Sequence, residues 1–415
     1  MKHTSIDWAP YIPSSWQEVR LKDIAKLESG SSITSDDIDQ LGEYPVFGGN
    51  GLRGFTDSYT NDGYHVLIGR QGALCGNINY AEGKFFASEH AVVVYPYDKK
   101  ESVIWLGETL KAANLNRLSA SAAQPGLAVN VLNFQMIPYP PKDVRKKIGE
   151  YLDAKTSEID RKISLLERKK DAYLRLKTAT INHAITRGLN PDAKLKDSGV
   201  EWIGLVPEHW EVKRLKDMGY LYSGLTGKSG DDFRNDDDSV TKLYIPFTNI
   251  LYNLEVSPDL LNRVVMEESE YQNKVKKGDL IFLMSSEDYE SIAKSAVVSE
   301  DIGEVYLNSF CRGYRILRSK IDPMFVNFQL NSMIYRNRLR LEARGFTRIN
   351  MKVDKIASIS VVLPSYDDQR KIVAYLREQC NQIDIIIRTI DRQAETYKRL
   401  KRSLINEVVT GQRTV

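Results

Sequence analysis

An internal duplication limits the possible folds of this chain more than any other feature of its sequence. One set of residues near the N-terminus recurs in the middle of the chain, and a second set in the middle recurs near the C-terminus. The first set, Trp8, Pro13, Trp16, Arg20, Leu21, Lys22, Asp23, Ser29 and Gly30, returns 194 positions later as Trp202, Pro207, Trp210, Arg214, Leu215, Lys216, Asp217, Ser223 and Gly224. The second set, Pro140, Lys147, Ile148, Tyr151, Leu152, Ile159, Asp160, Tyr173, Leu176, Lys177, Ile181, Asn182 and Thr186, returns 224 positions later as Pro364, Lys371, Ile372, Tyr375, Leu376, Ile383, Asp384, Tyr397, Leu400, Lys401, Ile405, Asn406 and Thr410. Because a repeated sequence usually encodes a repeated structural unit, we expect two copies of one arrangement.

The middles of the two copies, residues 17–139 and 211–363, share little sequence beyond their edges. Short apolar or β-branched runs within them predict strands, and longer apolar stretches predict helices. The expected strands are His65–Ile68, Ala91–Tyr95, Leu280–Met284, Ala296–Ser299 and Ile359–Leu363, and the expected helices are Trp105–Leu115 and Pro323–Ala343. Each middle is therefore expected to form a compact α+β domain. Edges that match between the two copies, around middles that differ, suggest a common scaffold with two different recognition surfaces. A duplicated structural protein whose loops have diverged in sequence would look similar.

The segments that follow the two middles have the apolar spacing of long coiled-coil helices. Apolar residues recur in steps of four and three, no proline interrupts them, and each run ends at a threonine with glycine close behind. The expected coiled-coil seam contains Leu152, Ile159, Ile163, Leu166, Tyr173, Leu376, Ile383, Ile387, Ile390 and Tyr397. A helix from Ile148 to Thr186 would be about 58 Å long. Intramolecular antiparallel pairing is the simplest arrangement of the two helices, and a dimerisation coiled coil between chains is the alternative.

The composition excludes several classes of protein. The formal net charge is only +3, which does not by itself mark a nucleic-acid binder. The three cysteines are far apart and the five histidines form no metal-spaced pair, so neither a disulfide framework nor a metal site is expected. No segment has the roughly 20 consecutive apolar residues of a membrane span, and the N-terminus has no secretion signal. We therefore expect a cytoplasmic protein without a membrane partner.

Three short motifs imitate catalytic sites without the context that these need. Residues 47–51, Phe-Gly-Gly-Asn-Gly, match an S-adenosylmethionine loop, but a turn-like sequence follows where a helix should begin, and residues 139–142 lack the companion motif of DNA methyltransferases. Residues 227–229, Gly-Lys-Ser, resemble the end of a P-loop whose first glycine is replaced by Tyr222. The nuclease-like Pro191-Asp192 has no counterpart in the other copy. No catalytic residue is therefore expected in this chain.

Candidate nucleic-acid contacts occur in both middles. Arg336, Arg340 and Arg344 are spaced for one helix face that Gly345 should end, where they could contact phosphates. Side chains suited to base edges are expected at Thr347, Arg348 and Asn350 in the second middle, and at Arg70, Gln71, Gln124 and Asn130 in the first. A solvated helix face and ordinary structural turns are the alternatives. The helical segments carry net charges of +6 and +3, which leaves −6 for the rest, so we expect partner subunits to supply phosphate contacts.

The order of variable domain, helix repeat, variable domain and helix repeat resembles type I restriction-modification specificity subunits. The resemblance lies in residues 206–217, their counterpart 12–23, and the stretches 140–186 and 363–410. Members often have Glu-Gln before the helix. This chain has Asp368-Gln369 in the second copy but Val144-Arg145 in the first.

The resemblance implies a non-catalytic DNA specificity subunit with a pseudo-twofold duplicated α+β fold. Its implied parts are a target recognition domain at 1–140, a helical spacer at 141–190, a second target recognition domain at 191–364 and a C-terminal helical spacer at 365–415. Each recognition domain would read one half of a bipartite asymmetric site in double-stranded DNA, and the helices would set the spacer. The implied partners are two methyltransferase subunits and the restriction-translocase subunits, which would hold S-adenosylmethionine, ATP and Mg²⁺. The alternatives are a combined methyltransferase-recognition enzyme and a coiled-coil scaffold that does not bind DNA.

Overall fold

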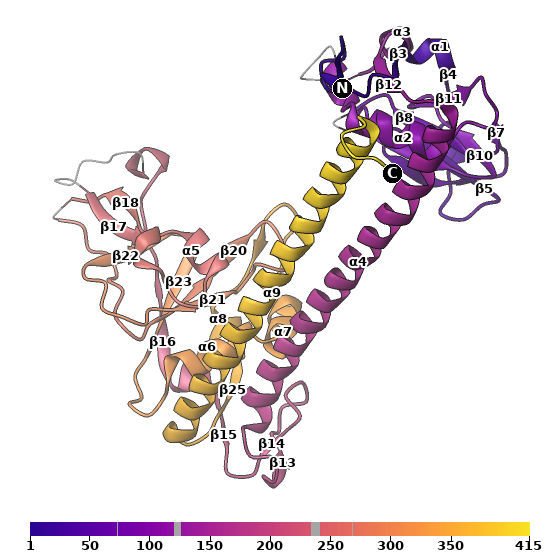
Figure 1. The fold of residues 1–415 in the computed structure, drawn as a ribbon. Coiled ribbons are helices and arrows are strands. Elements are labelled where there is room, and N and C mark those ends of the chain that lie inside the picture. Colours follow the sequence, from indigo (N-terminus) through magenta and orange to yellow (C-terminus); the bar gives the residue numbers. More distant parts are fainter. Residues whose placement is uncertain (73, 120–125, 234–240, 268) are drawn as a thin grey trace. The chain divides into compact units, whose positions relative to one another are not determined.

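The chain folds into two compact units, each of which contains residues from distant parts of the sequence. The computed structural model describes residues 1–72, 74–119, 126–233, 241–267 and 269–415. Unit 1 consists of Met1–Lys169 and Thr389–Val415, and unit 2 consists of Lys170–Arg388. The long helices α4 (Lys142–Arg187) and α9 (Tyr366–Val409) each contribute one part to each unit (Figure 1).

Unit 1 contains two four-stranded sheets. Its strands are β1 (Lys2–His3), β2 (Tyr11–Ile12), β3 (Gln17–Arg20), β4 (Ala25–Ser29), β5 (Tyr44–Gly48), β6 (Gly51–Thr56), β7 (Asn61–Asp62), β8 (His65–Gly69), β9 (Ile78–Ala81), β10 (Lys84–Ala87), β11 (Ala91–Pro96) and β12 (Met136–Tyr139). Its short helices are α1 (Leu21–Ile24), α2 (Val103–Ala112) and α3 (Val129–Asn133). The first sheet has the order β4-β11-β8-β9 with antiparallel neighbours, and the second has the order β6-β5-β10-β7 with β5 and β10 parallel.

Unit 2 has its own set of strands and helices. The strands are β13 (Leu195–Asp197), β14 (Leu205–Pro207), β15 (Glu211–Arg214), β16 (Gly219–Ser223), β17 (Thr241–Ile245), β18 (Asn262–Val265), β19 (Leu280–Leu283), β20 (Ser285–Ser286), β21 (Ser295–Val297), β22 (Val305–Leu307), β23 (Cys311–Ile316), β24 (Ile349–Asn350) and β25 (Ser360–Leu363). The helices are α5 (Phe247–Tyr252), α6 (Pro323–Asn331), α7 (Met333–Glu342) and α8 (Val353–Ala357). The strands predicted from the sequence in both middles are confirmed to within two residues at their ends.

The two middles have the same topology although their sequences differ. The order β16-β23-β19-β21 in unit 2 corresponds to β4-β11-β8-β9 in unit 1, and every neighbouring pair is antiparallel in both. The second sheet of unit 2, β18-β17-β22, repeats the parallel pairing of β5 with β10 in its β17 and β22. The core positions of such sheets need apolar volume rather than particular side chains. The duplication therefore extends through the middles, where the sequence shows little of it.

The residues repeated at the edges of each middle close its base. Residues 17–139 begin and end on paired strands, with Gln17 opposite Tyr139 in β3 and β12. Residues 211–363 do the same, with Glu211 opposite Leu363 in β15 and β25. The repeated Arg-Leu-Lys-Asp motif begins at the last residue of the first strand of each pair. The Nε atom of its arginine lies 3.0 Å from a carboxylate oxygen of its aspartate in unit 1 and 3.1 Å in unit 2.

Each long helix ends at a glycine that packs against a repeated tryptophan. Gly188 after α4 has a φ of +76° and lies against Trp210, and Gly411 after α9 has a φ of +71° and lies against Trp16. Both tryptophans are buried. Glycine takes this left-handed conformation without a steric penalty, so it both ends the helix and lets the indole approach the backbone.

Helices α4 and α9 pair antiparallel within the chain, and the residues predicted for the seam are buried or partly buried. In unit 1, Leu152 and Ile159 of α4 belong to the same core cluster as Leu404 and Val408 of α9. In unit 2, α4 contributes Ile185 and α9 contributes Ile372 and Leu376 to one cluster. The predicted seam residues Leu152, Ile159, Leu376, Ile383 and Ile390 are buried, and Ile163, Leu166, Tyr173, Ile387 and Tyr397 are partly buried. Apolar residues outside the seam, such as Leu165 and Ile385, are exposed.

The sequence departure at Arg145 has a structural compensation. Its counterpart Gln369 is buried, donates to the Pro364 carbonyl oxygen at 2.9 Å and accepts from the Asp322 amide at 2.8 Å. Arg145 likewise donates to the Pro140 carbonyl oxygen at 2.6 Å, but its guanidinium also binds the carboxylate of Glu101 at 2.8 Å. Both side chains of this ion pair are 5% exposed. A buried ion pair in unit 1 thus replaces a buried amide in unit 2. The helix begins at Lys142, earlier than the predicted Ile148.

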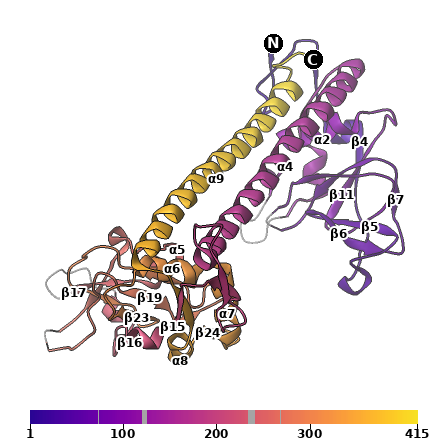
Figure 2. The ribbon, with the colours of Figure 1, turned by 90° about the horizontal axis from the view of Figure 1, so that it is seen from below.

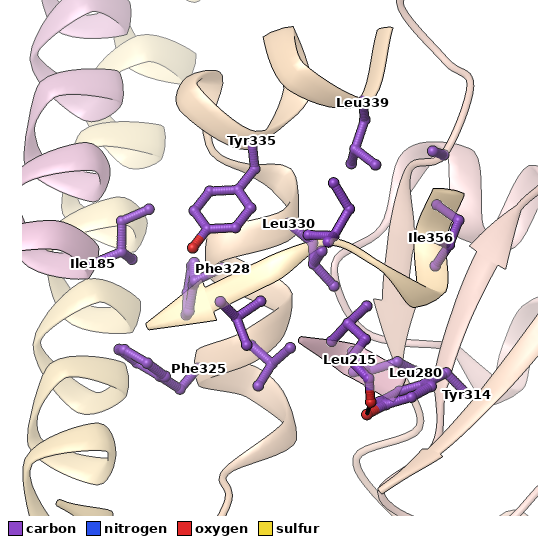
Figure 3. Packing of buried hydrophobic residues seen from close by; sticks show 14 of the residues in the cluster. Ile185, Leu215, Leu280, Tyr314, Phe325, Phe328, Leu330, Tyr335, Leu339 and Ile356 are labelled. Carbon is purple, nitrogen blue, oxygen red and sulfur yellow. Dashed lines mark hydrogen bonds between the residues drawn. The ribbon is translucent and has the colours of Figure 1, made fainter. Parts of the chain in front are cut away.

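The core of unit 2 is built from α6, α7 and α8, the first sheet and part of α4. Figure 3 shows Tyr335 and Phe328 beside Ile185 of α4, and all three are buried. The hydroxyl of Tyr335 donates to Gln329 Oε1 at 2.7 Å. The predicted single helix over residues 323–343 is wrong, because Ser332 is extended (ψ 156°) and separates α6 from α7. Its hydroxyl donates to the Gln329 carbonyl oxygen and so helps to end α6.

Candidate DNA-recognition surface

A hairpin that follows α7 and includes β24 carries several of the predicted site residues of unit 2; Figure 2 labels both elements. It spans residues 344–350 and is closed by two backbone hydrogen bonds between Arg344 and Asn350, of 3.0 and 2.8 Å. The predicted residues Thr347, Arg348 and Asn350 are all exposed in this hairpin. They are therefore placed where base edges or phosphates could reach them.

Three aromatic and backbone contacts hold this hairpin in place. The guanidinium of Arg348 lies over the ring of Phe310, 4.4 Å from its centroid. The hydroxyl of Tyr289 donates to the Gly345 carbonyl oxygen at 3.1 Å. Beyond the hairpin, the Met351 amide donates to the Met284 carbonyl oxygen at 2.9 Å. The hairpin is thus attached to the loops at the ends of β19 and β23, and we call this combined surface the edge surface of unit 2.

The expected arginine stripe is wrong at two of its three positions. Arg336 is buried, and its Nη2 donates to the carbonyl oxygens of Glu290 and Ile292, at 3.0 and 2.5 Å. Burial, with the charge of Arg340 as the next cause, lowers the pKa of Arg336 to about 10. Helix α7 ends at Glu342, so Arg344 lies in the hairpin and not on the helix. The spacing of the arginines describes one helix face, but that face covers a loop.

Arg340 and its neighbour Arg338 are on α7, and both are engaged with carboxylates. Arg340 forms an ion pair with Glu290, and Arg338 forms one with Glu342 at 2.5 Å. Arg344 is exposed and its Nη1 donates to the carbonyl oxygens of Leu341 and Ala343. The cations with the best access to a ligand are therefore Arg344 and Arg348.

Unit 1 has a corresponding surface, which contains its predicted residues. Gln71 forms an isolated antiparallel bridge with Gly126, just as Ser285 pairs with Asn350 in unit 2. The Leu127 amide donates to the Arg70 carbonyl oxygen at 2.9 Å, which matches the bond from Met351 to Met284. We call residues 69–72, 88–90 and 126–130 the edge surface of unit 1.

The predicted residues of unit 1 occupy this edge surface in different ways. Arg70 is partly buried and its Nη1 donates to the Ser29 hydroxyl at 3.0 Å, whereas Gln71 is exposed. Asn130 is exposed in α3, where its side chain accepts from the Val131 amide. Gln124 lies outside the described residues. The structure thus brings Arg70 and Gln71 next to the segment that leads to Asn130, although 55 to 60 positions separate them in the sequence.

Sequence reasoning missed the aromatic side chains that complete the edge surface of unit 2. Phe310 and Tyr289 reach the hairpin from loops that are far away in sequence. The counterpart of Phe310 in unit 1 is His90, whose carbonyl oxygen accepts from the Arg70 amide as that of Phe310 accepts from the Met284 amide. No local pattern around Phe310 or Tyr289 would have identified them, because their role depends on long-range pairing of strands.

The short motifs that imitate catalytic sites adopt structures unlike those sites. Phe47 and Gly48 end β5 and Gly51 begins β6, so this loop joins two antiparallel strands and not a strand and a helix. Lys228 forms an ion pair with Glu270 at 2.5 Å. Within the described residues, no group of three potential metal ligands is found. In the same part of the chain, none of the helices is apolar enough over a sufficient length to span a membrane.

Comparison with known proteins identifies the class to which this architecture belongs. Residues 13–171 and 207–395 match the type I restriction modification DNA specificity domain, so the chain belongs to this family and contains two copies of its domain. The specificity subunit of the type I restriction enzyme EcoprrI from Escherichia coli is 39% identical over 165 residues, which are 39% of this chain and 41% of that protein. The specificity subunit of MjaVIII from Methanocaldococcus jannaschii is 22% identical over 425 residues, which cover 96% of this chain and 93% of that protein.

Solved structures show the same fold at low sequence identity. One chain from a study of complex assembly and conformational transition of the type I restriction-modification system has a TM-score of 0.68 and 14% identity, and the match covers 96% of this chain and 98% of that one. The HsdS subunit from Thermoanaerobacter tengcongensis has a TM-score of 0.52 and 14% identity over 99% of this chain and 100% of that one. The protein is a type I restriction-modification specificity subunit.

Proposed function

We propose that each unit reads one half of a bipartite DNA sequence through its edge surface. The observation that carries this proposal is the repetition of one topology with unlike side chains at the same place. Unit 1 presents Arg70 and Gln71 there, whereas unit 2 presents Thr347, Arg348 and Asn350. Arginine pairs best with guanine, and glutamine or asparagine with adenine. Because the two sets differ, the recognised site is asymmetric.

The paired helices set the number of base pairs between the two halves. Both α4 and α9 are continuous through the residues of both units. Their pairing is internal to the chain and is fixed by a seam of buried apolar residues. A helix rises by about 1.5 Å per residue, so a change in helix length changes the distance between its ends by a defined amount.

The chain has no catalytic role of its own and acts with partners in the cytoplasm. Two methyltransferase subunits and the restriction-translocase subunits carry S-adenosylmethionine, ATP and Mg²⁺ and perform the chemistry. The charge distribution supports this division, because the residues outside the helical segments 142–187 and 366–413 carry a net charge of −6. Neutralisation of phosphates supplies most non-specific DNA affinity, so partner subunits that close around the duplex would add the missing contacts.

Exchange of one middle tests whether each unit reads its half of the DNA site independently of the other. Residues 17–139 are replaced by the corresponding middle of another specificity subunit, with the junctions at Gln17 and Tyr139, which face each other in paired strands. Methylome sequencing of cells that express the chimera with its methyltransferase should show a change in one half of the modified sequence. A change in both halves of the methylated sequence would contradict the proposal. A methylated sequence identical to that of the unmodified chain would contradict it as well.

A change of helix length tests the role of the spacer. One heptad is inserted into both α4 and α9 at repeat-equivalent positions, so that the seam keeps its phase. The methylated sequence should keep both halves and change only in the number of bases between them. As a matched control, insertion of seven residues in the loop between β13 and β14 leaves the helices unchanged and should leave the spacer unchanged.

A further inference from the structure

Phe346 stands at the tip of the hairpin of unit 2 with almost all of its surface exposed. The side chain is 98% exposed, whereas Ile349 in the same hairpin is buried. Single exposed apolar residues are common on proteins, so exposure alone decides nothing. The hairpin around Phe346, however, is held by specific contacts, and these decide how the ring is presented.

The backbone on either side of Phe346 is constrained. Gly345 has a φ of +145°, and a Cβ atom there would lie 2.0 Å from the Arg348 carbonyl oxygen, so only glycine fits. Tyr289 binds the Gly345 carbonyl oxygen, and Arg348 stacks on Phe310. The base of the hairpin is therefore fixed, while both faces of the Phe346 ring remain free.

The charges beside Phe346 indicate what the ring can enter. Arg344 and Arg348 lie two residues before and two residues after it, both are exposed, and residues 344–350 contain no acidic side chain. An aromatic ring between two cations matches the layers of a nucleic acid, in which apolar base stacks lie between rows of phosphates. A phenyl ring can contact DNA in two ways: one face can pack on a thymine methyl group, or the ring can insert between two bases, which contact both faces. Because both faces of the Phe346 ring are free, insertion is possible.

We infer that Phe346 inserts between adjacent base pairs of the half-site that unit 2 reads. The inference rests on the proposed function and adds a mode of contact to it. Inserted apolar side chains unstack a base step, and pyrimidine–purine steps unstack most easily. The half-site of unit 2 therefore contains such a step opposite Phe346, and part of its recognition comes from the deformability of this step. Arg344 binds a phosphate beside this step, and Arg348 reads a base edge next to it.

Base unstacking in the assembled complex tests this inference. The chain is combined with its methyltransferase subunits and a duplex that carries the site found by methylome sequencing. Permanganate, which oxidises unstacked thymines, and 2-aminopurine placed at successive positions report the state of each step. The wild-type complex should show a hyper-reactive step in the half-site of unit 2 that is distinct from the methylated adenine, which a methyltransferase flips out of the stack. The Phe346→Ala variant should lose this signal and bind about tenfold more weakly, as expected for loss of one stacked ring, while Phe346→Trp should keep the signal.

A matched control uses Tyr271, another aromatic residue of unit 2, which is 94% exposed and lies outside the hairpin. The Tyr271→Ala variant should keep the hyper-reactive step and the wild-type affinity. Thermal unfolding of both variants should match the wild type, since neither ring is packed. If the wild-type complex methylates a bipartite site but unstacks no step other than at the methylated adenine, or if Phe346→Ala keeps the second unstacked step, the inference is wrong and the proposed function stands. If no bipartite site is methylated, the proposed function itself is wrong.

Discussion

In unit 2, the Nζ atom of Lys177 in α4 donates to both carboxylate oxygens of Asp384 in α9, at 2.7 and 2.8 Å. Within unit 1, Lys401 of α9 holds Asp160 of α4 at 2.7 and 2.6 Å. Each lysine and each aspartate is the counterpart of the other at the offset of 224 positions. The same ion pair is thus built twice with the roles of the helices exchanged. This is the pattern of a duplicated helix that pairs antiparallel with its own copy.

Reversal of one charge in this pair should weaken the helix pairing. The Asp384→Lys variant places a second ammonium group beside Lys177, and we expect the free energy of unfolding to fall by about 1 kcal/mol, because both groups are partly exposed. Addition of Lys177→Asp should recover most of the loss. Chemical denaturation of the two single variants and the double variant measures this coupling. Glu378→Lys, at an exposed position of α9 outside the seam, is the control.

A mixture of the two single variants distinguishes pairing within the chain from pairing between chains. If α4 of one molecule paired with α9 of another, equimolar Asp384→Lys and Lys177→Asp chains would restore each other. We expect no recovery from the mixture, because the partners of each ion pair belong to one chain.

The buried ion pair of unit 1 should be sensitive to the loss of either member. The Arg145→Gln variant leaves Glu101 buried without its cation, and we expect the free energy of unfolding to fall by about 3 kcal/mol. Ile321 stands in unit 2 where Glu101 stands in unit 1, immediately before the N-cap of the corresponding helix. The double variant Arg145→Gln, Glu101→Ile therefore copies unit 2 and should recover much of the stability. A double variant less stable than Arg145→Gln would contradict this explanation.

Acid should weaken a cluster around Glu304 on the second sheet of unit 2. Hydrogen bonds from Lys274, Tyr306 and Lys242 lower the pKa of Glu304 to about 2, below its ordinary value of 4.5. A carboxylate with a lowered pKa stabilises the folded chain above pH 4.5, and this contribution is lost as the pH falls towards 2. Since the side chain is 40% exposed, we expect less than about 1 kcal/mol. Urea denaturation at pH 6 and pH 3 should show a smaller loss of stability in Glu304→Gln than in the wild type.

The long helices were predictable because their evidence is local and repetitive. A heptad pattern places residues such as Ile159 and Ile383 on one face whatever the partner is, and these residues are buried as predicted. The strands of the middles were predictable for the same reason. Their common topology was not predictable. It depends on which strands pair, as Val92 of β11 pairs with Ile68 of β8, and the two copies share too little sequence in these strands to show that the same pairs form in both.

The candidate site was predictable only in part, because helical spacing identifies a face without saying what covers it. Arg336 has the spacing of a surface stripe, yet its side chain is buried and donates to the carbonyl oxygens of Glu290 and Ile292 in a loop. Arg348 was correctly placed on the surface, but its stacking on Phe310 depends on strand pairing over a distance that no local motif spans.

Removal of one edge-surface side chain should affect one half of the recognised sequence. In the Arg348→Ala variant we expect relaxed discrimination at one position of the half-site of unit 2, by about 1 to 3 kcal/mol, and unchanged discrimination in the other half. The Gln71→Ala variant should do the converse, because its exposed amide lies on the edge surface of unit 1. The measurement is the methylation rate of the complete complex on duplexes with single base changes in each half. Arg340→Ala, which removes a cation already paired with Glu290, is the control and should leave both halves unchanged. If either edge-surface variant relaxed both halves equally, the side chains would act through general phosphate affinity and not through separate reading of the two halves.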